Sequence, residues 1–169
     1  SWMTLCLSLM GAKIIGFSEY SKKEHVLHGK IRKKIKNYSQ NYYDISKKEN
    51  IQKVINKFKP EIVFHLAAQP LVLDSVDNPV YTFNTNIIGT INLLDSLKNK
   101  KFIKNIVVIT TDKVYENLDN SKKFKETDKI GGLDPYSSSK ACVEIICNSY
   151  YNTYFKKNKI NLSTVRAGN

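Results

Sequence analysis

Cysteine, glycine and proline are scarce in this chain, which has three, seven and four copies of them in 169 residues. So little glycine and proline excludes a collagen-like protein, and an apolar fraction of 41% excludes a wholly disordered one. An odd number of cysteines does not fit a disulfide framework. Cys142 and Cys147 fall on different faces of a predicted helix, so we expect reduced thiols and a cytoplasmic protein.

Long hydrophobic runs are also missing. The most apolar stretch, Trp2 to Phe17, is divided by Gly11 and interrupted by Lys13, and it lacks a basic leader and a cleavage site. It is therefore neither a signal peptide nor a membrane span, and we expect no membrane partner. A helix followed by a strand over Lys13–Phe17 fits this stretch better.

Acidic residues are outnumbered by basic ones, 15 to 27, which gives a net charge of +12. Such a charge would suit nucleic acid or a phosphorylated ligand. Most of the excess is lysine spread along the chain, and the densest stretch, Lys22 to Lys36, has no aromatic residues at stacking positions. We interpret that stretch as an amphipathic helix with a solvated lysine face, and we expect no nucleic-acid partner.

Strand-like and helix-like segments alternate along the rest of the chain. Further strands are predicted near Tyr42-Tyr43 and over 61–66, 106–110 and 161–166, with helices over 51–58, 79–97 and 135–157. The apolar run 61–66 is typical of a strand that is buried on both faces of a parallel sheet. The alternation predicts an α/β fold with a doubly wound, Rossmann-like parallel sheet.

The stretch Asp134-Pro-Tyr-Ser-Ser-Ser-Lys140 carries the clearest chemical signal. Pro135 suits the first turn of a helix, and the spacing then places Tyr136 and Lys140 one turn apart on the same face. A lysine ammonium near a phenol favours the phenolate. Tyr136 is therefore a candidate base for a hydroxyl proton.

Polar residues follow the predicted strand 106–110, where Thr111, Asp112 and Lys113 come in succession. Ligands of open α/β sheets bind at the carboxyl ends of the strands, so these residues are candidates for a site. We expect the loop 124–134, which contains Gly131-Gly132, to be flexible enough to fold over it.

Small and polar residues surround the other predicted strand end. Ala67 and Ala68 follow strand 61–66 and would let a ligand approach the backbone. His65 is interpreted as a packed core histidine, because no other ligand lies at metal-binding spacing. Asn86, inside a predicted helix, needs a partner on a neighbouring strand or loop.

Four strings together resemble a known family: 64–72, 110–117, 131–141 and 166–169. They are similar to the CDP-glucose 4,6-dehydratases, within the extended short-chain dehydrogenase/reductase superfamily of nucleotide-sugar enzymes, and the resemblance covers the whole chain. It implies a lyase that converts CDP-glucose to CDP-4-dehydro-6-deoxyglucose for bacterial surface polysaccharide (O-antigen, lipopolysaccharide). It also implies a bound NAD, regenerated in each turnover, and a homodimeric full-length protein.

The resemblance assigns five catalytic roles. Tyr136 would take the proton of the sugar 4-hydroxyl, and Lys140 would hold the nicotinamide ribose. Thr111 would bind the 4-oxygen, and Asp112 would protonate the departing 6-hydroxyl. Lys113 stands where related dTDP-glucose dehydratases carry a glutamate base, and it is either the C5 base or a stabiliser of the enolate.

The resemblance also implies ligand contacts, and it implies no metal. Asp44 and Ile45 would contact the adenine, and Ser18 the adenosine ribose. The remaining implied cofactor contacts are Leu66, Ala67, Ala68 and Gln69 at the pyrophosphate and ribose, Thr85 and Thr110 along the cleft, and Tyr136 and Lys140. Asn169 matches a substrate contact.

Two parts of the family pattern are missing from residues 1–169. The glycine-rich turn that follows the first strand would lie before Ser1, and most of the nucleotide-sugar pocket would lie beyond Asn169. We therefore expect this chain to be a partial NAD-binding domain, inactive by itself, with the first strand and the substrate-binding part outside it.

Alternative functions come from the same superfamily and from another class. Another nucleotide-sugar dehydratase or a 4-epimerase is the nearest, although an epimerase needs no acid such as Asp112 at C6. A non-catalytic module that binds NAD or nucleic acid would not need Thr111, Asp112, Tyr136 and Lys140 together.

Overall fold

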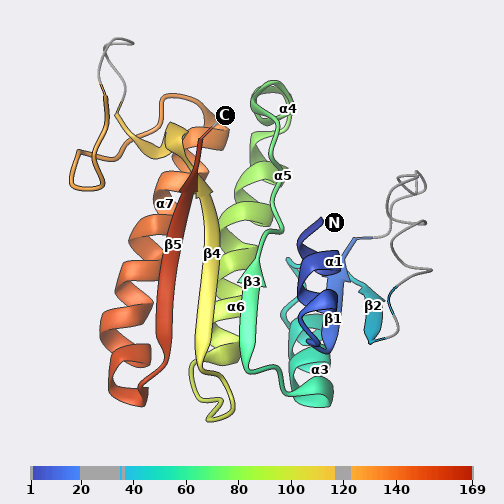
Figure 1. The fold of residues 1–169 in the computed structure, drawn as a ribbon. Helices are drawn as coiled ribbons and strands as arrows, with labels where there is room; N and C mark the ends of the chain where they lie inside the picture. Colours follow the sequence, from blue (N-terminus) through green and yellow to red (C-terminus); the bar gives the residue numbers. More distant parts are fainter. Residues whose placement is uncertain (1, 20–34, 36, 117–122, 169) are drawn as a thin grey trace. The chain divides into compact units, whose positions relative to one another are not determined.

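The computed structural model describes residues 2–19, 35, 37–116 and 123–168, and the chain forms two compact units, 1–44 and 45–169 (Figure 1). In the first unit, helix α1 (Trp2–Leu9) leads into strand β1 (Ile14–Ser18), which pairs in parallel with β2 (Tyr38–Tyr42). The predicted helix and strands of this region are confirmed. The helix predicted over 22–36 falls, apart from the buried Ile35, outside the described residues.

The second unit is built on a three-stranded parallel sheet. Its strands are β3 (Ile62–His65), β4 (Asn105–Thr111) and β5 (Asn161–Ala167), in the order β3-β4-β5. His65 pairs with Val108, and Thr111 pairs with Ala167. The three strands run in one direction, so their carboxyl ends lie at the same edge of the sheet.

Helices precede β3 and fill the connections between the three strands. They are α3 (Lys48–Phe58), α4 (Val72–Asp77), α5 (Pro79–Phe83), the π-helical η1 (Asn84–Ile88), α6 (Gly89–Leu97), the 3-10 turn η2 (Asp112–Val114), α7 (Pro135–Tyr150), the π-helical η3 (Tyr151–Phe155) and the 3-10 turn η4 (Lys156–Asn158). The predicted helices are confirmed, whereas α4 and the π-helical segments were not predicted. Among the residues described, no helix combines the length and apolar character needed to cross a membrane.

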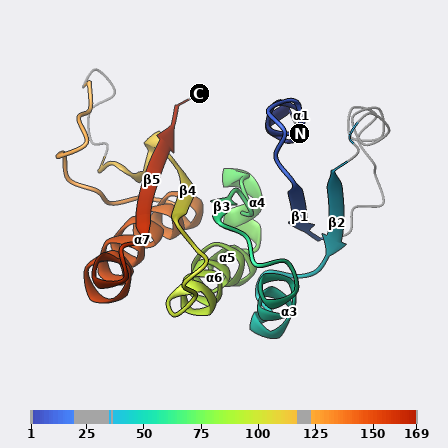
Figure 2. The ribbon, with the colours of Figure 1, turned by 60° about the horizontal axis from the view of Figure 1, so that its bottom comes forward.

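One face of the three-stranded sheet carries the core of the second unit. The helical segments α5–η1–α6 and α7 lie on this face (Figures 1 and 2), and Ile106 and Val108 of β4 are buried. On β3, Ile62 and Phe64 are 52% and 38% exposed, so the prediction that this strand is buried on both faces is wrong for the described residues. The apolar run was read as two-sided burial, but the helices of this unit cover one side.

His65 joins β3 to the helix layer. Its Nε2 lies 2.8 Å from the Thr90 hydroxyl on α6, and the ring is buried, which confirms the prediction of a packed histidine. Burial lowers the pKa of His65 from 6.5 to about 3, and the nearby charge of Lys140 acts in the same direction. Between pH 6.5 and about 3, the ring is therefore neutral in the folded protein but protonated in the unfolded chain.

This histidine predicts a pH-dependent stability. Below pH 6.5 the unfolded chain binds a proton at His65 that the folded protein binds only near pH 3, so stability falls as the pH falls through that window. In the intact protein, His65→Gln should reduce that loss by about 1 kcal/mol per pH unit. Urea unfolding of both proteins at pH 7 and pH 5 measures this loss of unfolding free energy. An equal loss in the wild type and in His65→Gln would contradict the low pKa of His65.

Candidate active site

The end of β4 carries three of the predicted catalytic residues in one tight turn. Thr111 is buried and caps η2, where its hydroxyl oxygen accepts a hydrogen bond from the Lys113 backbone N–H at 3.3 Å. The same hydroxyl donates to Asp112 Oδ1 at 3.1 Å. The Thr111 side chain thus holds the orientation of the Asp112 carboxylate at the end of β4.

A cavity of about 310 Å³ adjoins this turn and is lined by Asp112, Lys113, Tyr115, Phe124 and Leu133. The Tyr115 and Phe124 rings stack with their centroids 4.6 Å apart. The Asp112 and Lys113 side chains are 46% and 42% exposed, and Lys113 Nζ lies 3.9 Å from Asp112 Oδ1. A carboxylate and an ammonium are thus available together at one rim of the sheet.

Helix α7 begins beside the same edge. Asp134 accepts hydrogen bonds from the N–H and the hydroxyl of Ser137, at 2.9 and 2.6 Å, and Pro135 occupies the first turn as predicted. A Cβ at Gly132 would lie 2.2 Å from backbone atoms of Ser137 and Ser138. Gly132 is therefore needed for a close approach of the loop to the helix, rather than for the flexibility that we expected there.

Tyr136 and Lys140 lie four residues apart on α7 and so share one helical face. The backbone N–H of Tyr136 donates to the hydroxyl of Ser75 on α4 at 3.1 Å. Lys140 Nζ donates to the Ile109 carbonyl on β4 at 2.8 Å. This bond brings the Lys140 ammonium to β4 two residues before Thr111, and η2 itself packs against α7.

Lys140 is an unusual cation because its side chain is buried. Burial lowers the pKa of Lys140 from 10.5 to about 8, although Cys147 and Glu144 of the same helix act to raise it. The ammonium is still mainly protonated at neutral pH. An ammonium has three N–H donors, and Ile109 takes one of them, so the group can bind a hydroxyl at the sheet edge as well.

The loop after β3 is held by Asn86 of η1. Asn86 Oδ1 accepts from the Gln69 N–H at 2.8 Å, and Asn86 Nδ2 donates to the Gln69 carbonyl at 3.1 Å. The same Nδ2 donates to the Ser139 hydroxyl at 2.8 Å, which links the loop to α7. The prediction that Asn86 binds a neighbouring loop is confirmed, and it lies in a π-helical segment, as many functional residues do.

The loop residues themselves differ in accessibility. Ala67 and Ala68 are half-buried, so their small side chains leave the backbone open at the carboxyl end of β3, and Leu66 is 51% exposed. Gln69 is buried, and its side-chain amide bonds the backbone of Leu71. The alanines therefore suit a ligand phosphate or ribose, whereas the Gln69 side chain shapes the loop.

The other predicted ligand contacts are spread over the structure. Ile45 is buried against α6, where a Cβ at Gly89 would lie 2.8 Å from its side chain. The Thr110 hydroxyl is buried and donates to Glu144 at 2.6 Å, and Thr85 lies half-buried on η1. Ser18 and Asp44 belong to the first unit, where Ser18 Oγ accepts from Gln40 at 2.9 Å. Asn169 lies outside the described residues.

Three residues that shape this edge were missed in the sequence. Ser75 is completely buried and receives the Tyr136 N–H, but nothing in its local sequence marks it. Ser139 binds Asn86 from within the serine run before Lys140. Glu144 follows Lys140 by one helical turn, and this Lys-x-x-x-Glu spacing is a signal that could have identified it.

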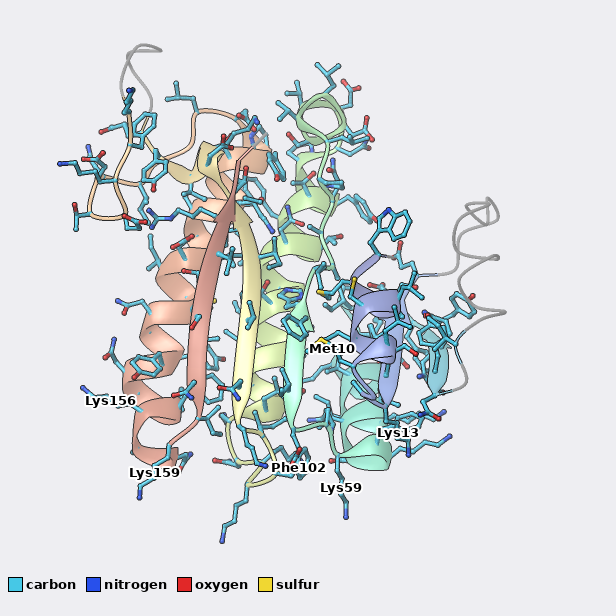
Figure 3. All side chains as sticks on the ribbon, viewed as in Figure 1. Met10, Lys13, Lys59, Phe102, Lys156 and Lys159 are labelled. Atoms are coloured by element: carbon cyan, nitrogen blue, oxygen red, sulfur yellow. The ribbon has the colours of Figure 1, made fainter. Side chains whose placement is uncertain are left out.

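Lysines also lie at the opposite edge of the three-stranded sheet. Figure 3 shows Lys59, Phe102 and Lys159 at the opposite end, beside the amino ends of β3, β4 and β5. Within the described residues no group of three or more His, Cys, Asp or Glu side chains could hold a metal ion.

Known proteins resemble this chain in sequence. The family model described as GDP-mannose 4,6 dehydratase matches residues 1–164. The CDP-glucose 4,6-dehydratase of Salmonella typhimurium is 38% identical over all of this chain, which spans 48% of that enzyme. The chain thus covers about half the length of this curated relative.

Solved structures show the same fold. The dTDP-glucose 4,6-dehydratase of Bacillus anthracis in complex with NAD superposes with a TM-score of 0.76 and 27% identity, over 96% of this chain and 49% of that one. The UDP-glucose 4-epimerase of Thermus thermophilus in complex with NAD gives 0.82 and 23%, over 97% and 50%. The doubly wound, Rossmann-like fold class is therefore confirmed.

The two hydrogen bonds between Asn86 and the Gln69 backbone give a prediction for stability. In the intact protein, Asn86→Ala should lower the free energy of unfolding by about 1–3 kcal/mol, because the Gln69 N–H and carbonyl lose their buried partner. Asn84→Ala is the matched control on the exposed side of the same π-helical segment and should change it by less than about 0.5 kcal/mol. Urea unfolding measures the free energy of unfolding of both variants. Equal losses would mean that the Asn86 hydrogen bonds do not stabilise the loop after β3.

Proposed function

Because the chain belongs to the GDP-mannose 4,6 dehydratase family, we propose that it is the core of a nucleotide-sugar 4,6-dehydratase that converts CDP-glucose to CDP-4-dehydro-6-deoxyglucose. The choice of CDP-glucose is supported by the identity to the Salmonella enzyme along the whole chain. The dehydratase chemistry is supported by one observation above all: Asp112 and Lys113 line a cavity at the end of β4, the strand that Lys140 binds.

The residues at the sheet edge fit NAD as cofactor. Ala67 and Ala68 leave the backbone open after β3, and Asn86 fixes that loop. Lys140 would bind the nicotinamide ribose with the N–H donors that Ile109 does not use. When bound, the cofactor supplies a hydride acceptor at C4 of the sugar and returns the hydride at C6.

Oxidation at C4 requires removal of the 4-hydroxyl proton. Tyr136 takes this proton, and the Lys140 ammonium on the same helical face stabilises the phenolate that accepts it. The Thr111 hydroxyl hydrogen-bonds the sugar 4-oxygen. Thr111 caps η2 and Lys140 binds Ile109 two residues earlier on β4, so both groups are positioned by the end of one strand.

Elimination of water then follows from the 4-ketone, which acidifies the C5 proton. Loss of that proton and cleavage of the C6–O bond form the C5–C6 double bond, while Asp112 protonates the leaving hydroxyl to give water. Lys113 is either the C5 base or the cation that stabilises the enolate, and its ammonium lies 3.9 Å from Asp112 Oδ1. The cavity that Asp112 lines would be closed to water by the bound sugar.

A 4-epimerase is the second candidate, because solved UDP-glucose 4-epimerases share this fold. Epimerisation requires Tyr136 and Lys140 but no acid at C6, so the Asp112–Lys113 pair favours the dehydratase. A module that only binds NAD or nucleic acid would not need these groups together, and the enzyme proposal predicts weak, nonspecific nucleic-acid binding that salt reduces.

We further propose that the full protein is a cytoplasmic homodimer that serves surface-polysaccharide synthesis. Residues 1–169 would then supply part of the NAD-binding domain of that protein and would be inactive alone. Exposed apolar side chains on α5 and α7 support the dimer: Val80 and Ile145 are 72% and 59% exposed. The described cysteines are free, which suits a reducing compartment.

Substrate choice is the direct test of this function. The intact protein should convert CDP-glucose to a 4-keto-6-deoxy product in the presence of NAD, and it should leave dTDP-, UDP- and GDP-hexoses unchanged. Products are identified by mass spectrometry and NMR. The appearance of C4 epimers alone would mean that the dehydratase proposal is wrong.

The role of Asp112 gives a second test. Asp112→Asn should lower kcat for dehydration by about 10²–10⁴-fold, since a general acid contributes about that factor. Oxidation at C4 should persist. The reduced cofactor should therefore accumulate when the sugar is added, and its absorbance at about 340 nm should rise. Glu61→Gln, which removes an exposed carboxylate before β3, is the matched control and should leave kcat unchanged. A variant that loses C4 oxidation as well would place Asp112 elsewhere in the mechanism.

A further inference from the structure

Glu144 of α7 is a buried carboxylate that none of the catalytic roles above uses. Its two oxygens accept four hydrogen bonds: Oε1 from the Thr110 hydroxyl at 2.6 Å and Arg166 Nε at 3.0 Å, and Oε2 from Arg166 Nη2 at 3.0 Å and the Thr164 hydroxyl at 3.2 Å. The Glu144 and Arg166 side chains are only 8% and 18% exposed. Such a two-pronged, buried pair has a fixed geometry, unlike an exposed ion pair.

The partners of Glu144 lie at the two strand ends that form the site edge. Thr110 directly precedes Thr111, the last residue of β4, after which Asp112 begins η2, and Arg166 lies near the end of β5. The carboxyl end of β5 also approaches Asp112, because a Cβ at Gly168 would lie 3.9 Å from Asp112 Oδ2. One carboxylate on α7 therefore holds both strand ends that flank the Asp112 turn.

Arg166 has further partners at this edge of the sheet. Besides Glu144, its Nη1 donates to the Glu126 carbonyl at 3.2 Å, and its guanidinium lies over the Tyr115 ring, 4.7 Å from the centroid. Tyr115 lines the cavity beside Asp112. The Glu144–Arg166 pair thus reaches the cavity wall as well as the strand ends.

Glu144 also lies one helical turn after Lys140 on the same face of α7. Burial alone would raise the pKa of Glu144, but the hydrogen bonds from Arg166 and Thr110 bring it below its usual value, so the carboxylate is ionised at neutral pH. Cys147 also acts to raise the pKa of Lys140, but burial raises the pKa of this thiol to about 12, so it is uncharged at neutral pH. Glu144 is then the ionised group of α7 that opposes the loss of the Lys140 proton.

We propose that Glu144 is a positioning residue for the site, which clamps the carboxyl ends of β4 and β5 to α7 and places a fixed negative charge behind Lys140. The expected effect on catalysis rests on the proposed function, whereas the effect of Glu144 on the protonation of Lys140 does not. Glu144 thus has a part in setting both the position of Thr111 and the charge of the Tyr136–Lys140 pair.

The test compares Glu144→Gln with two variants of the intact protein. Glu144→Asp restores the charge with a shorter side chain, and Asp95→Asn removes a carboxylate from a second ion-pair cluster, with Lys48 and Lys98, away from the site. The first readout is the titration of Lys140, followed by NMR of ¹³C-labelled lysine and assigned with Lys140→Arg. The second is the pH profile of kcat on CDP-glucose.

Glu144→Gln should move the Lys140 titration to lower pH by about one pH unit, and the alkaline limb of kcat should move with it. Its kcat near pH 7 should fall by at least about tenfold with little change in KM, because small displacements of catalytic groups are costly. Glu144→Asp should recover part of both effects. Asp95→Asn should lower only the urea midpoint.

A folded Glu144→Gln protein with an unchanged Lys140 titration would overturn the inference. An equal loss of kcat in Glu144→Gln and Asp95→Asn, with unchanged pH profiles, would also overturn it, because it would reduce Glu144 to a general stabiliser. If the wild-type protein fails to dehydrate CDP-glucose while the Lys140 titration still depends on Glu144, the proposed function fails and the positioning role stands.

Discussion

The hydrogen bond from the Lys140 ammonium to the Ile109 carbonyl is the contact on which the arrangement of the site depends. It joins α7 to β4 at the sheet edge, so that the helix carrying Tyr136 meets the strand that ends in Thr111 and Asp112. Keeping this cation buried is costly, and the cost appears as the lowered pKa of Lys140, about 8. In the function that we propose, Lys140 uses its remaining N–H donors to hold the nicotinamide ribose and stabilises the Tyr136 phenolate.

Buried side-chain hydrogen bonds near this contact hold the surrounding loops and strand ends in place. Ser75 receives the N–H of Tyr136, Asn86 holds the loop after β3, and Glu144 binds β4 and β5. Each of these side chains is buried and satisfied, so losing one partner would leave another buried polar group unpaired. The helices position the site through specific side-chain hydrogen bonds as well as through packing.

Much of this could be predicted from the sequence. The periodic segments located the strands, and Pro135 with Tyr136 and Lys140 identified the start of α7, because local patterns dictate these features. The π-helical turn at Asn86, the Ser75 contact and the role of Gly132 depend on tertiary approach, which no local pattern encodes. The one-sided burial of β3 was also missed, since an apolar run does not tell which face is covered.

We propose that NAD bound at the carboxyl edge of the sheet would take a hydride from C4 and return it to C6 of the same sugar, while Asp112 protonates the departing 6-hydroxyl. The most direct measurement uses CDP-glucose deuterated at C4 with the intact protein and follows the label by NMR. The proposed mechanism requires deuterium at C6 of the 4-keto-6-deoxy product. Deuterium that remains at C4, or that is lost to solvent with none at C6, would contradict it.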